Sequence, residues 1–382
     1  MAKNFYRNSH PGARKEIAKL IEGVNEGDRL AAVMLTERLG TTDGMFAFAD
    51  LTNVNFQREY AEAPSIWQKF AGRTTVGDFR TINWVSFDED FSNFKVEDKG
   101  VVRAPGTLPK VAEGEKYQAF SLTIQRALGF SVEKHGAQVG LTWEAFINDP
   151  WNTVARLPQV LTRLATKTVD AKATAALFAA ADAQPHVQGV SAAESLTGVA
   201  VATDSALTYD ALVEAWRQLK GKKDAKGNSV TLESRYVLNV SPGLVPQAEN
   251  ILRQQILVRR QGTATNYTET TVVPTFGNIE VVENPFLAFF TGNDTSWILS
   301  PAGGGTSLGD PAIAVAFLAG EETPEIRVSG LAGYTPNGQA LPFTSGSFDT
   351  DTFDMRIRHI TGAGSVNPLP MIMSDGTGAP SN

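Results

Sequence analysis

One polar stripe that runs through residues 150–181 constrains the fold more than any other feature of the sequence. Its members recur at steps of three or four, which places them on one face of an α-helix. A helix over this span measures roughly 45 Å, and Asp149 with Pro150 supplies an N-cap and a first turn. Its alanine-rich second half allows close packing, so we expect a long helix beside a sheet. The solvent stripe comprises Arg156, Gln159, Arg163, Lys167, Asp170 and Thr174, and the apolar residues expected to lie away from it are Trp151, Val154, Leu157, Leu161, Leu164 and Leu177.

Segments with a two-residue hydrophobic period flank a long irregular stretch that precedes this helix. Leu122 and Ile124 alternate with polar neighbours, as do Val139 and Leu141, which predicts β-strands. Residues 96–120 are rich in glycine, proline and charge and lack a core-forming pattern. A connection of this length is unusual inside a compact domain. We therefore expect a protruding hairpin; a disordered segment and a lid are the alternatives.

Beyond a Gly-, Ser- and Ala-rich boundary at residues 189–204 the pattern becomes α/β. Thr208 and Gly221 are the expected caps of one helix. The tail after Pro370 is expected to fray. Further expected elements are strands at 236–240, 279–282, 297–299 and 353–360 and a helix at 246–253.

The composition limits the chemistry that the chain can perform. Its 382 residues include no cysteine, which excludes thiolate metal sites, iron–sulfur clusters and cysteine nucleophiles. No apolar run reaches the roughly 20 residues of a membrane span, and the first residues lack a signal-peptide stretch. The formal net charge is −7 and no basic–aromatic stripe is present, which argues against a nucleic-acid reader.

Complete phosphate-binding and metal-binding motifs are missing from the sequence. No complete phosphate-binding loop occurs, and the histidines lack the spacing of a zinc site. We therefore predict no catalytic residue, no cofactor and no metal, and we expect His359 to be exposed or at an interface. The histidines are His10, His135, His186 and His359.

Several short motifs, taken in order, resemble one protein family. The chain is similar to the major capsid proteins of tailed bacteriophages, which have the Hong Kong 97-type fold, and it looks most like the transposable-phage (Mu-like) head subunits. No single motif is specific, but their order and spacing together are. The motifs are residues 53–60 (NVNFQREY), Trp67, residues 78–80 (DFR), residues 109–115 (PKVAEGE), residues 147–149 (IND), residues 352–359 (TFDMRIRH) and Gly362.

The resemblance implies an α+β fold with an N-terminal arm and an extended β-hairpin loop. A long spine helix with a β-sheet would form a peripheral (P) domain, and an α/β unit would form an axial (A) domain. The expected divisions are residues 1–75 for the arm and the segment leading into the fold, 76–202 for the P domain with the extended loop at 88–125 and the spine at 150–181, 203–308 for the A domain, and 309–382 for the return to the P-domain sheet and the C-terminal tail.

The same resemblance implies a structural role, with assembly into hexamers and pentamers of an icosahedral shell that encloses double-stranded phage DNA by non-specific contact. Scaffolding and portal proteins, and decoration proteins where present, are the implied partners. The implied location is the virion, after assembly in the host bacterial cytoplasm, with no membrane involved. In the charged loop we expect inter-subunit ion pairs from Lys99, Arg103, Lys110, Glu113 and Lys116. In the basic arm we expect contacts to a neighbouring subunit or to DNA from Arg7, Arg14, Lys15 and Lys19.

Two other functions remain open at this point. The first is the shell of a cellular encapsulin-like nanocompartment, which would contain a cargo protein in place of DNA. The second is an α/β enzyme in which residues 96–120 form a lid, which would be a monomer or small oligomer with a deep pocket.

Overall fold

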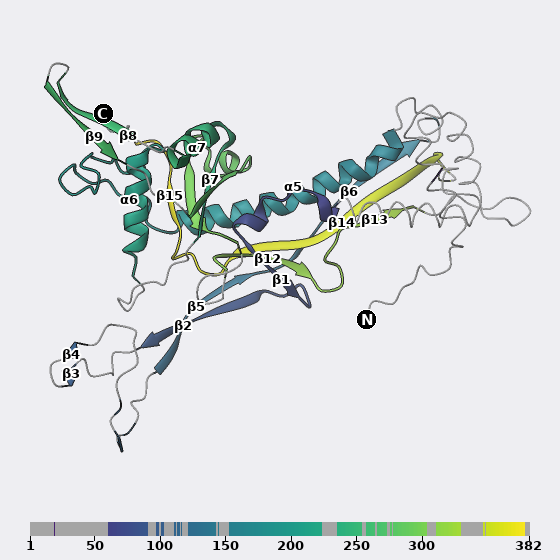
Figure 1. The fold of residues 1–382 in the computed structure, drawn as a ribbon. Helices are drawn as coiled ribbons and strands as arrows, with labels where there is room; N and C mark the ends of the chain where they lie inside the picture. The colour runs from purple at the N-terminus through teal and green to yellow at the C-terminus, as the bar shows by residue number, and fades with distance from the viewer. Residues whose placement is uncertain are drawn as a thin grey trace, which may run out of the picture.

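A computed structural model describes most of the chain (Figure 1). The residues described are 19, 60–90, 97–98, 101–102, 111, 113–114, 116, 121–142, 144, 153–223, 235–253, 257–263, 266–272, 276, 278–303, 311–329, 347 and 349–378.

The predicted long helix is present as α5, Thr153–Asp182. It lies alongside the long strand β14, Thr352–Ser365, across the middle of the molecule (Figure 1). Side chains along its second half, including Val169, Ala173 and Leu177, pack in the main apolar core. Because that core also contains residues from two different sheets, α5 joins the two sheets into one body.

The first sheet is built around β14. Its strand order is β1–β12–β14–β13, and β6 pairs with β14 outside that path. β1 is parallel to β12, while β6, β12 and β13 are all antiparallel to β14. The strands are β1 (Gly72–Val76), β6 (Glu133–Thr142), β12 (Ile313–Leu318) and β13 (Glu325–Val328).

The second sheet belongs to the predicted α/β unit. Its order is β10–β7–β11–β15, with β10 parallel to β7 and the other neighbours antiparallel. Helix α6 begins where predicted, because the Thr208 side chain accepts a hydrogen bond from the backbone N–H of Ala211, and it ends at Gly221. The elements are α6 (Tyr209–Lys220), β7 (Tyr236–Val240), η2 (Pro242–Leu244), α7 (Val245–Arg253), β10 (Ile279–Glu283), α8 (Leu287–Thr291), β11 (Trp297–Pro301) and β15 (Ile372–Ser374).

The expectation that the tail frays after Pro370 is wrong. Residues 372–374 form β15, which is buried and pairs with β11 of the second sheet. Met371 and Met373 enter the core against α5, and Ile372 enters the core of the α/β unit. Alternating apolar side chains that face two cores therefore hold this part of the tail in place. The alternation is too short to have predicted a strand among the surrounding prolines and glycines.

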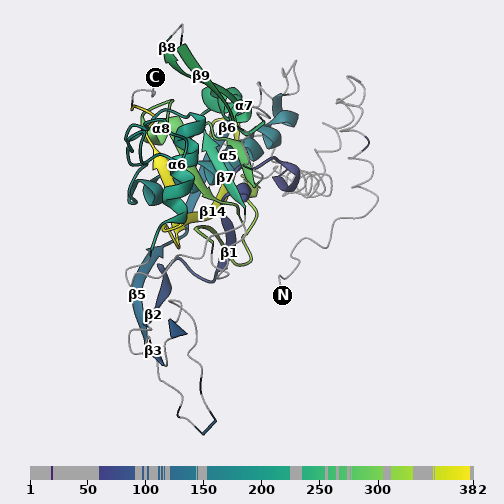
Figure 2. The ribbon, with the colours of Figure 1, turned by 60° about the vertical axis from the view of Figure 1, so that its left-hand side comes forward.

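Two-stranded hairpins extend from this body. The strands β2 (Ile82–Asp90) and β5 (Ser121–Phe130) pair antiparallel on either side of the predicted loop, with a register shift between Ser86 and Phe87. A short pair, β3 (Glu97–Asp98) and β4 (Val101–Val102), lies within that loop. A second hairpin consists of β8 (Leu257–Thr263) and β9 (Asn266–Val272). Figures 1 and 2 both show the two long hairpins leaving the body in different directions.

The predicted solvent stripe of α5 is wrong in its second half. Gln159, Arg163 and Lys167 are exposed as expected, but Asp170 and Thr174 are buried. Their polar atoms are bound inside the protein, which is why burial there is tolerated. The helical period identifies a polar face, but here that face is covered by another part of the chain.

The expectation of an exposed or interfacial His359 is also wrong. The side chain is 3% exposed and lies between the rings of Tyr60 and Phe317. Burial lowers the pKa of His359 to about 4, and a hydrogen bond with the backbone of Glu322 opposes that shift only partly.

Candidate inter-subunit surface

The first half of α5 leaves an apolar pair exposed to solvent. Val160 and Leu164 lie one helical turn apart, with 41% and 48% of their surfaces exposed. Arg163 and Lys167 are exposed on the same half of the helix. Leu164 was expected among the buried residues, so the prediction is wrong at that position.

The opposite side of the same helical segment is buried. Leu161 and Ala165 pack against Ile357 of β14, with Tyr60 and Ile326 at the margin of this small cluster. The segment therefore has one sheet to pack against rather than two. The apolar pair faces away from that sheet, where no described segment covers it.

The second half of α5 is tied to the segment that leads into β1. The Asp170 carboxylate accepts hydrogen bonds from the backbone N–H groups of Ile66 (3.0 Å) and Trp67 (3.1 Å). These groups lie at the start of the short helix η1, Trp67–Lys69, whose N-terminal N–H groups lack partners within the helix. Burial raises the pKa of Asp170, and the two backbone hydrogen bonds partly offset that rise.

A second polar contact lies one turn further along. The Thr174 hydroxyl donates to the backbone oxygen of Asp170 at 2.8 Å and contacts the side-chain amide of Asn284, which itself donates to Thr174 at 3.0 Å. Asn284 follows β10 directly, so this contact joins α5 to the α/β unit. Together the two contacts fix the second half of the spine within one subunit.

Three further apolar side chains are exposed elsewhere on the body. Phe289 of α8 is 80% exposed and stands edge-on to Phe290, with ring centroids 5.2 Å apart. Leu196 and Phe79 are also largely exposed. Single exposed apolar residues are common, so the adjacent pair on α5 is the more informative feature.

The described side chains of the hairpin β2–β5 form a core at its base. There Ile82 and Phe130 pack against Val132, Ala316 and Ile360. Among the strands that the structure describes, β2 and β5 pair only with each other. An isolated two-stranded ribbon is marginally stable in water, and its outer edges offer unpaired backbone groups to another chain.

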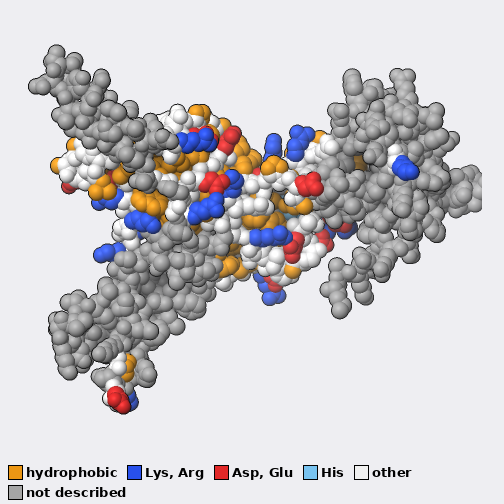
Figure 3. All heavy atoms as spheres, in the orientation of Figure 1, with side chains coloured by type: hydrophobic (Ala, Val, Ile, Leu, Met, Phe, Trp, Pro, Cys, Tyr) orange, Lys and Arg blue, Asp and Glu red, His pale blue; other side chains and the backbone are white. Residues whose placement is uncertain are grey.

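Charged side chains do not form a single-sign field on the face drawn in Figure 3, where Lys and Arg are interspersed with Asp and Glu. Several charged side chains of the described residues pair within the subunit. Arg358 contacts Glu321 at 2.9 Å and Glu325 at 2.7 Å, and Arg235 contacts Glu280 at 2.7 Å. The described part of the face in Figure 3 thus shows mixed charge rather than a basic patch.

Of the residues predicted to contact other subunits, three lie in the described part of the chain. Glu113, Lys116 and Lys19 are exposed, as a contact residue in the free subunit must be. The structure does not bring these three together, and their role stays a prediction. Lys99, Arg103, Lys110, Arg7, Arg14 and Lys15 lie outside the described residues.

The apolar pair on α5 is the surface feature that the sequence reasoning missed. A signal was present, because Val160 and Leu164 are spaced i, i+4 and flank Arg163 of the polar stripe. Such a mixed face is typical of a helix that is covered on two sides by different partners. Within the part of the chain that the structure covers, no helix is both long and apolar enough to cross a membrane.

Comparisons with known proteins identify the family. The family model described as "Phage capsid protein" matches residues 125–373. A solved capsid structure of the cyanophage P-SCSP1u is similar at 12% identity and a TM-score of 0.44, covering 82% of this chain and 88% of that chain. A structure from Mycobacterium phage Patience is similar at 13% identity and a TM-score of 0.44, covering 89% and 91%. The encapsulin of Synechococcus elongatus is similar at 10% identity and a TM-score of 0.39, covering 81% and 85%.

The match to the family model establishes the family, because structural similarities at this low identity and TM-score do not. No curated protein matches the chain. The matched residues run from within β5 to β15 and include α5 and strands of both sheets. The expected α+β capsid fold is confirmed, while the closer likeness to Mu-like head subunits stays a prediction. The chain belongs to the phage capsid protein family.

Proposed function

We propose that this capsid protein assembles into hexamers and pentamers that close an icosahedral shell around double-stranded DNA. The observation that carries the proposal is the exposed apolar pair Val160 and Leu164 on a helix whose second half is packed in the core. Burying such a pair against another copy contributes about 25 cal/mol for each Å² of apolar surface removed from water. Repetition of a modest contact around a closed shell multiplies its effect.

The projecting hairpin supports the same proposal. A two-stranded ribbon whose strands pair only with each other in the described part of the chain gains stability when it lies on a neighbouring subunit. In this arrangement the loop residues Lys99, Arg103, Lys110, Glu113 and Lys116 make inter-subunit ion pairs. Exposed pairs of this kind are worth about 0–1 kcal/mol each, so they act through their number and their geometry.

The remaining partners follow from the same role. The arm residues Arg7, Arg14, Lys15 and Lys19 contact an adjacent subunit or the packaged DNA, while the net charge of −7 keeps the inner wall from holding DNA tightly. Scaffolding and portal proteins, and decoration proteins where present, act during assembly in the host cytoplasm. The chain performs no catalysis in this scheme.

The division of labour within the subunit is also a proposal. Residues 76–202 and 309–370 form the P domain around α5 and β14, and residues 203–308 form the A domain near the capsomer centre. The pairing of β15 with β11 supports adding residues 372–374 to the A-domain sheet.

The test is light scattering with negative-stain electron microscopy on the purified chain, expressed alone and together with its neighbouring genes. We expect rings of five and six or closed particles for the wild type, and unassembled subunits for the double variant Val160→Ser/Leu164→Ser. The matched control is Leu196→Ser, which replaces an exposed apolar side chain outside α5 and should assemble normally.

Other outcomes separate the alternatives. Closed particles that contain a cargo protein and no DNA when isolated from infected or induced cells would indicate a nanocompartment. A stable monomer or dimer under every condition, with scaffolding supplied, would remove assembly as the function and reopen the enzyme hypothesis.

A further inference from the structure

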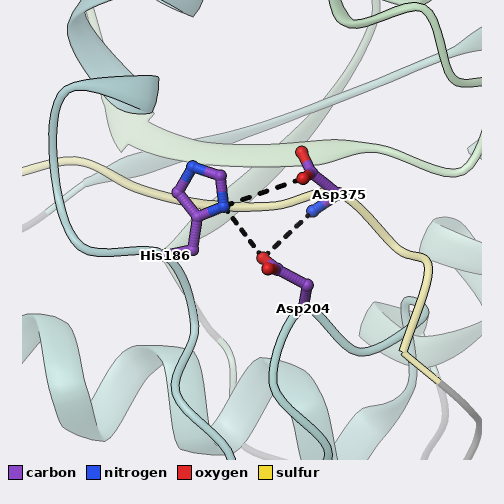
Figure 4. Close-up of side chains that lie close together, drawn as sticks. All are labelled: His186, Asp204 and Asp375. Carbon is purple, nitrogen blue, oxygen red and sulfur yellow. Dashed lines mark hydrogen bonds and ion pairs between the residues drawn. The ribbon is translucent and has the colours of Figure 1, made fainter.

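Three metal-ligating side chains meet where the second sheet joins the end of α5. His186, Asp204 and Asp375 each place one ligand atom within 4.8 Å of the others. The His186 Nδ1 atom lies 2.9 Å from Asp204 Oδ1 and 3.9 Å from Asp375 Oδ2 (Figure 4). The sequence spacing could not reveal this group, because its members lie as far apart along the chain as residues 186 and 375.

The two aspartates are held in place by backbone contacts. Asp204 has a left-handed backbone (φ 51°), its N–H donates to Val187 and its carbonyl accepts from Gly378 at 2.7 Å. The carbonyl of Asp375 accepts hydrogen bonds from Asn293 at 2.8 Å and Thr295 at 3.1 Å. A site whose ligands are already positioned loses little conformational entropy when an ion binds.

Negative charge exceeds positive charge around His186. A third carboxylate, Asp182 at the end of α5, has its Oδ1 atom 3.4 Å from His186 Nε2. Among the described residues, neither Asp182, Asp204 nor Asp375 makes an ion pair with a lysine or an arginine. Three carboxylates around one imidazole leave a net negative charge whether or not the ring is protonated, and a cation relieves their mutual repulsion.

The position of Asp182 supplies a second, separate indication. In metal sites a ligating histidine commonly directs its other ring N–H at a carboxylate, which fixes the tautomer and orients the ring. Asp182 faces Nε2, whereas Asp204 and Asp375 face Nδ1. Without an ion, Nδ1 and Asp204 Oδ1 lie within hydrogen-bond distance at 2.9 Å. When the ring proton is on Nε2 beside Asp182, the Nδ1 lone pair is free to bind an ion together with the two aspartates.

We propose that His186 Nδ1 and the carboxylates of Asp204 and Asp375 bind one divalent transition-metal ion of the zinc class. One imidazole nitrogen with two carboxylate oxygens favours zinc over magnesium and calcium, which take oxygen ligands. Water completes the coordination. The bound ion joins the end of the spine helix, the start of the α/β unit and the segment after β15, so it fixes the junction between the two sheets.

Zinc itself is the probe for the test. Unassembled full-length chain is cleared of metal with a chelator and titrated with zinc in competition with a chromogenic chelator, and its thermal unfolding is recorded with and without zinc. We expect one zinc per chain and a Tm that rises with zinc. Asp204→Asn and Asp375→Asn should each weaken binding by more than about tenfold, and Asp182→Asn by about tenfold.

Matched variants separate binding from folding. His135→Ala alters a histidine outside the group and should bind zinc like the wild type. Circular dichroism of the metal-free Asp375→Asn variant should match that of the wild type, because the backbone contacts of Asp375 remain.

Three results would overturn the proposal. The first is no saturable zinc binding by the wild-type chain. The second is equal zinc affinity in wild type, His186→Ala and Asp375→Asn, which would identify binding elsewhere. The third is calcium or magnesium binding that is as tight as zinc binding and independent of His186.

Discussion

The two halves of the spine helix α5 have the same backbone structure but different surroundings. From Val169 to Ala181 the helix lies between two sheets, and even its polar residues Asp170 and Thr174 are bound inside the subunit. From Leu157 to Lys167 it packs on one side only and leaves Val160 and Leu164 exposed. The comparison indicates that one half of the helix builds the subunit, while the other half is available to a neighbouring copy.

The largest effect is expected from shortening a buried side chain in the second half of α5. Leu177 is fully buried in the core between the sheets. Leu177→Ala should lower the free energy of unfolding by about 2–5 kcal/mol, because it removes apolar contacts and leaves a cavity. Urea unfolding of the unassembled subunit measures this loss. The same truncation at Leu164 is the matched control, and equal losses at both positions would contradict the proposed difference between the halves.

The next largest effect is expected at His359. Its ring contacts Phe317 of the main apolar core and Tyr60, which lies at the margin of the small cluster around Leu161 and Ile357. Its pKa is lowered to about 4, so the folded state binds fewer protons than the unfolded state between that value and the ordinary histidine range. Stability should therefore be fully present above about pH 6.5 and fall by about 2–3 kcal/mol as the pH drops to about 4.

Unfolding curves recorded across this pH range test the prediction. His359→Phe keeps a ring between Tyr60 and Phe317 and removes the titrating group, so its curve should be flatter than that of the wild type. An unchanged acid dependence in this variant would exclude His359 as its source.

A smaller effect is expected at Asp170. Asp170→Ala leaves the N–H groups of Ile66 and Trp67 without an acceptor and should lower the free energy of unfolding by about 1–3 kcal/mol. Asp170→Asn keeps an acceptor oxygen and should lower the free energy of unfolding by less. Because burial raises the pKa of Asp170, stability should also decline as the pH rises from the ordinary carboxyl range through that raised pKa. The Asn variant should lack this decline; its persistence would assign it to another carboxyl group.

The smallest effect on folding is expected at the exposed pair. Val160→Ser/Leu164→Ser should change the unfolding free energy by no more than about 0.5 kcal/mol for each substitution. Assembly should nevertheless be lost, as measured by sedimentation of particles. A stable subunit that still assembles would show that this face is not an interface.

The sequence predicted helices and strands well where the signal comes from residues that are close together along the chain. Thr208 and Gly221 bound α6 as expected, and the apolar run of residues 236–240 is a buried strand. The caps act through nearby backbone groups, so their effect is visible in a short window. The family resemblance rested on motif order, and the capsid family that it named is the one whose model matches residues 125–373.

What the sequence could not reveal depends on segments distant along the chain. Asp170 is buried because residues 66 and 67 fold over it, and His359 is buried because Tyr60 packs against it edge-on and Phe317 stacks on it. Leu164 is exposed because this part of α5 packs on Ile357 of β14 through its opposite side. A helical or strand period identifies faces, but only the tertiary fold determines which faces are covered.

The long strand β14 has a mechanical consequence. Its residues Thr352–Thr361 pair with β6, Met355–Arg358 pair with β13, and Thr361–Ser365 pair with β12. A tension applied along β14 would load all three hydrogen-bond ladders in shear at the same time, rather than opening one pair after another. A pull on either end of β14 is therefore distributed over its pairings with β6, β12 and β13 together.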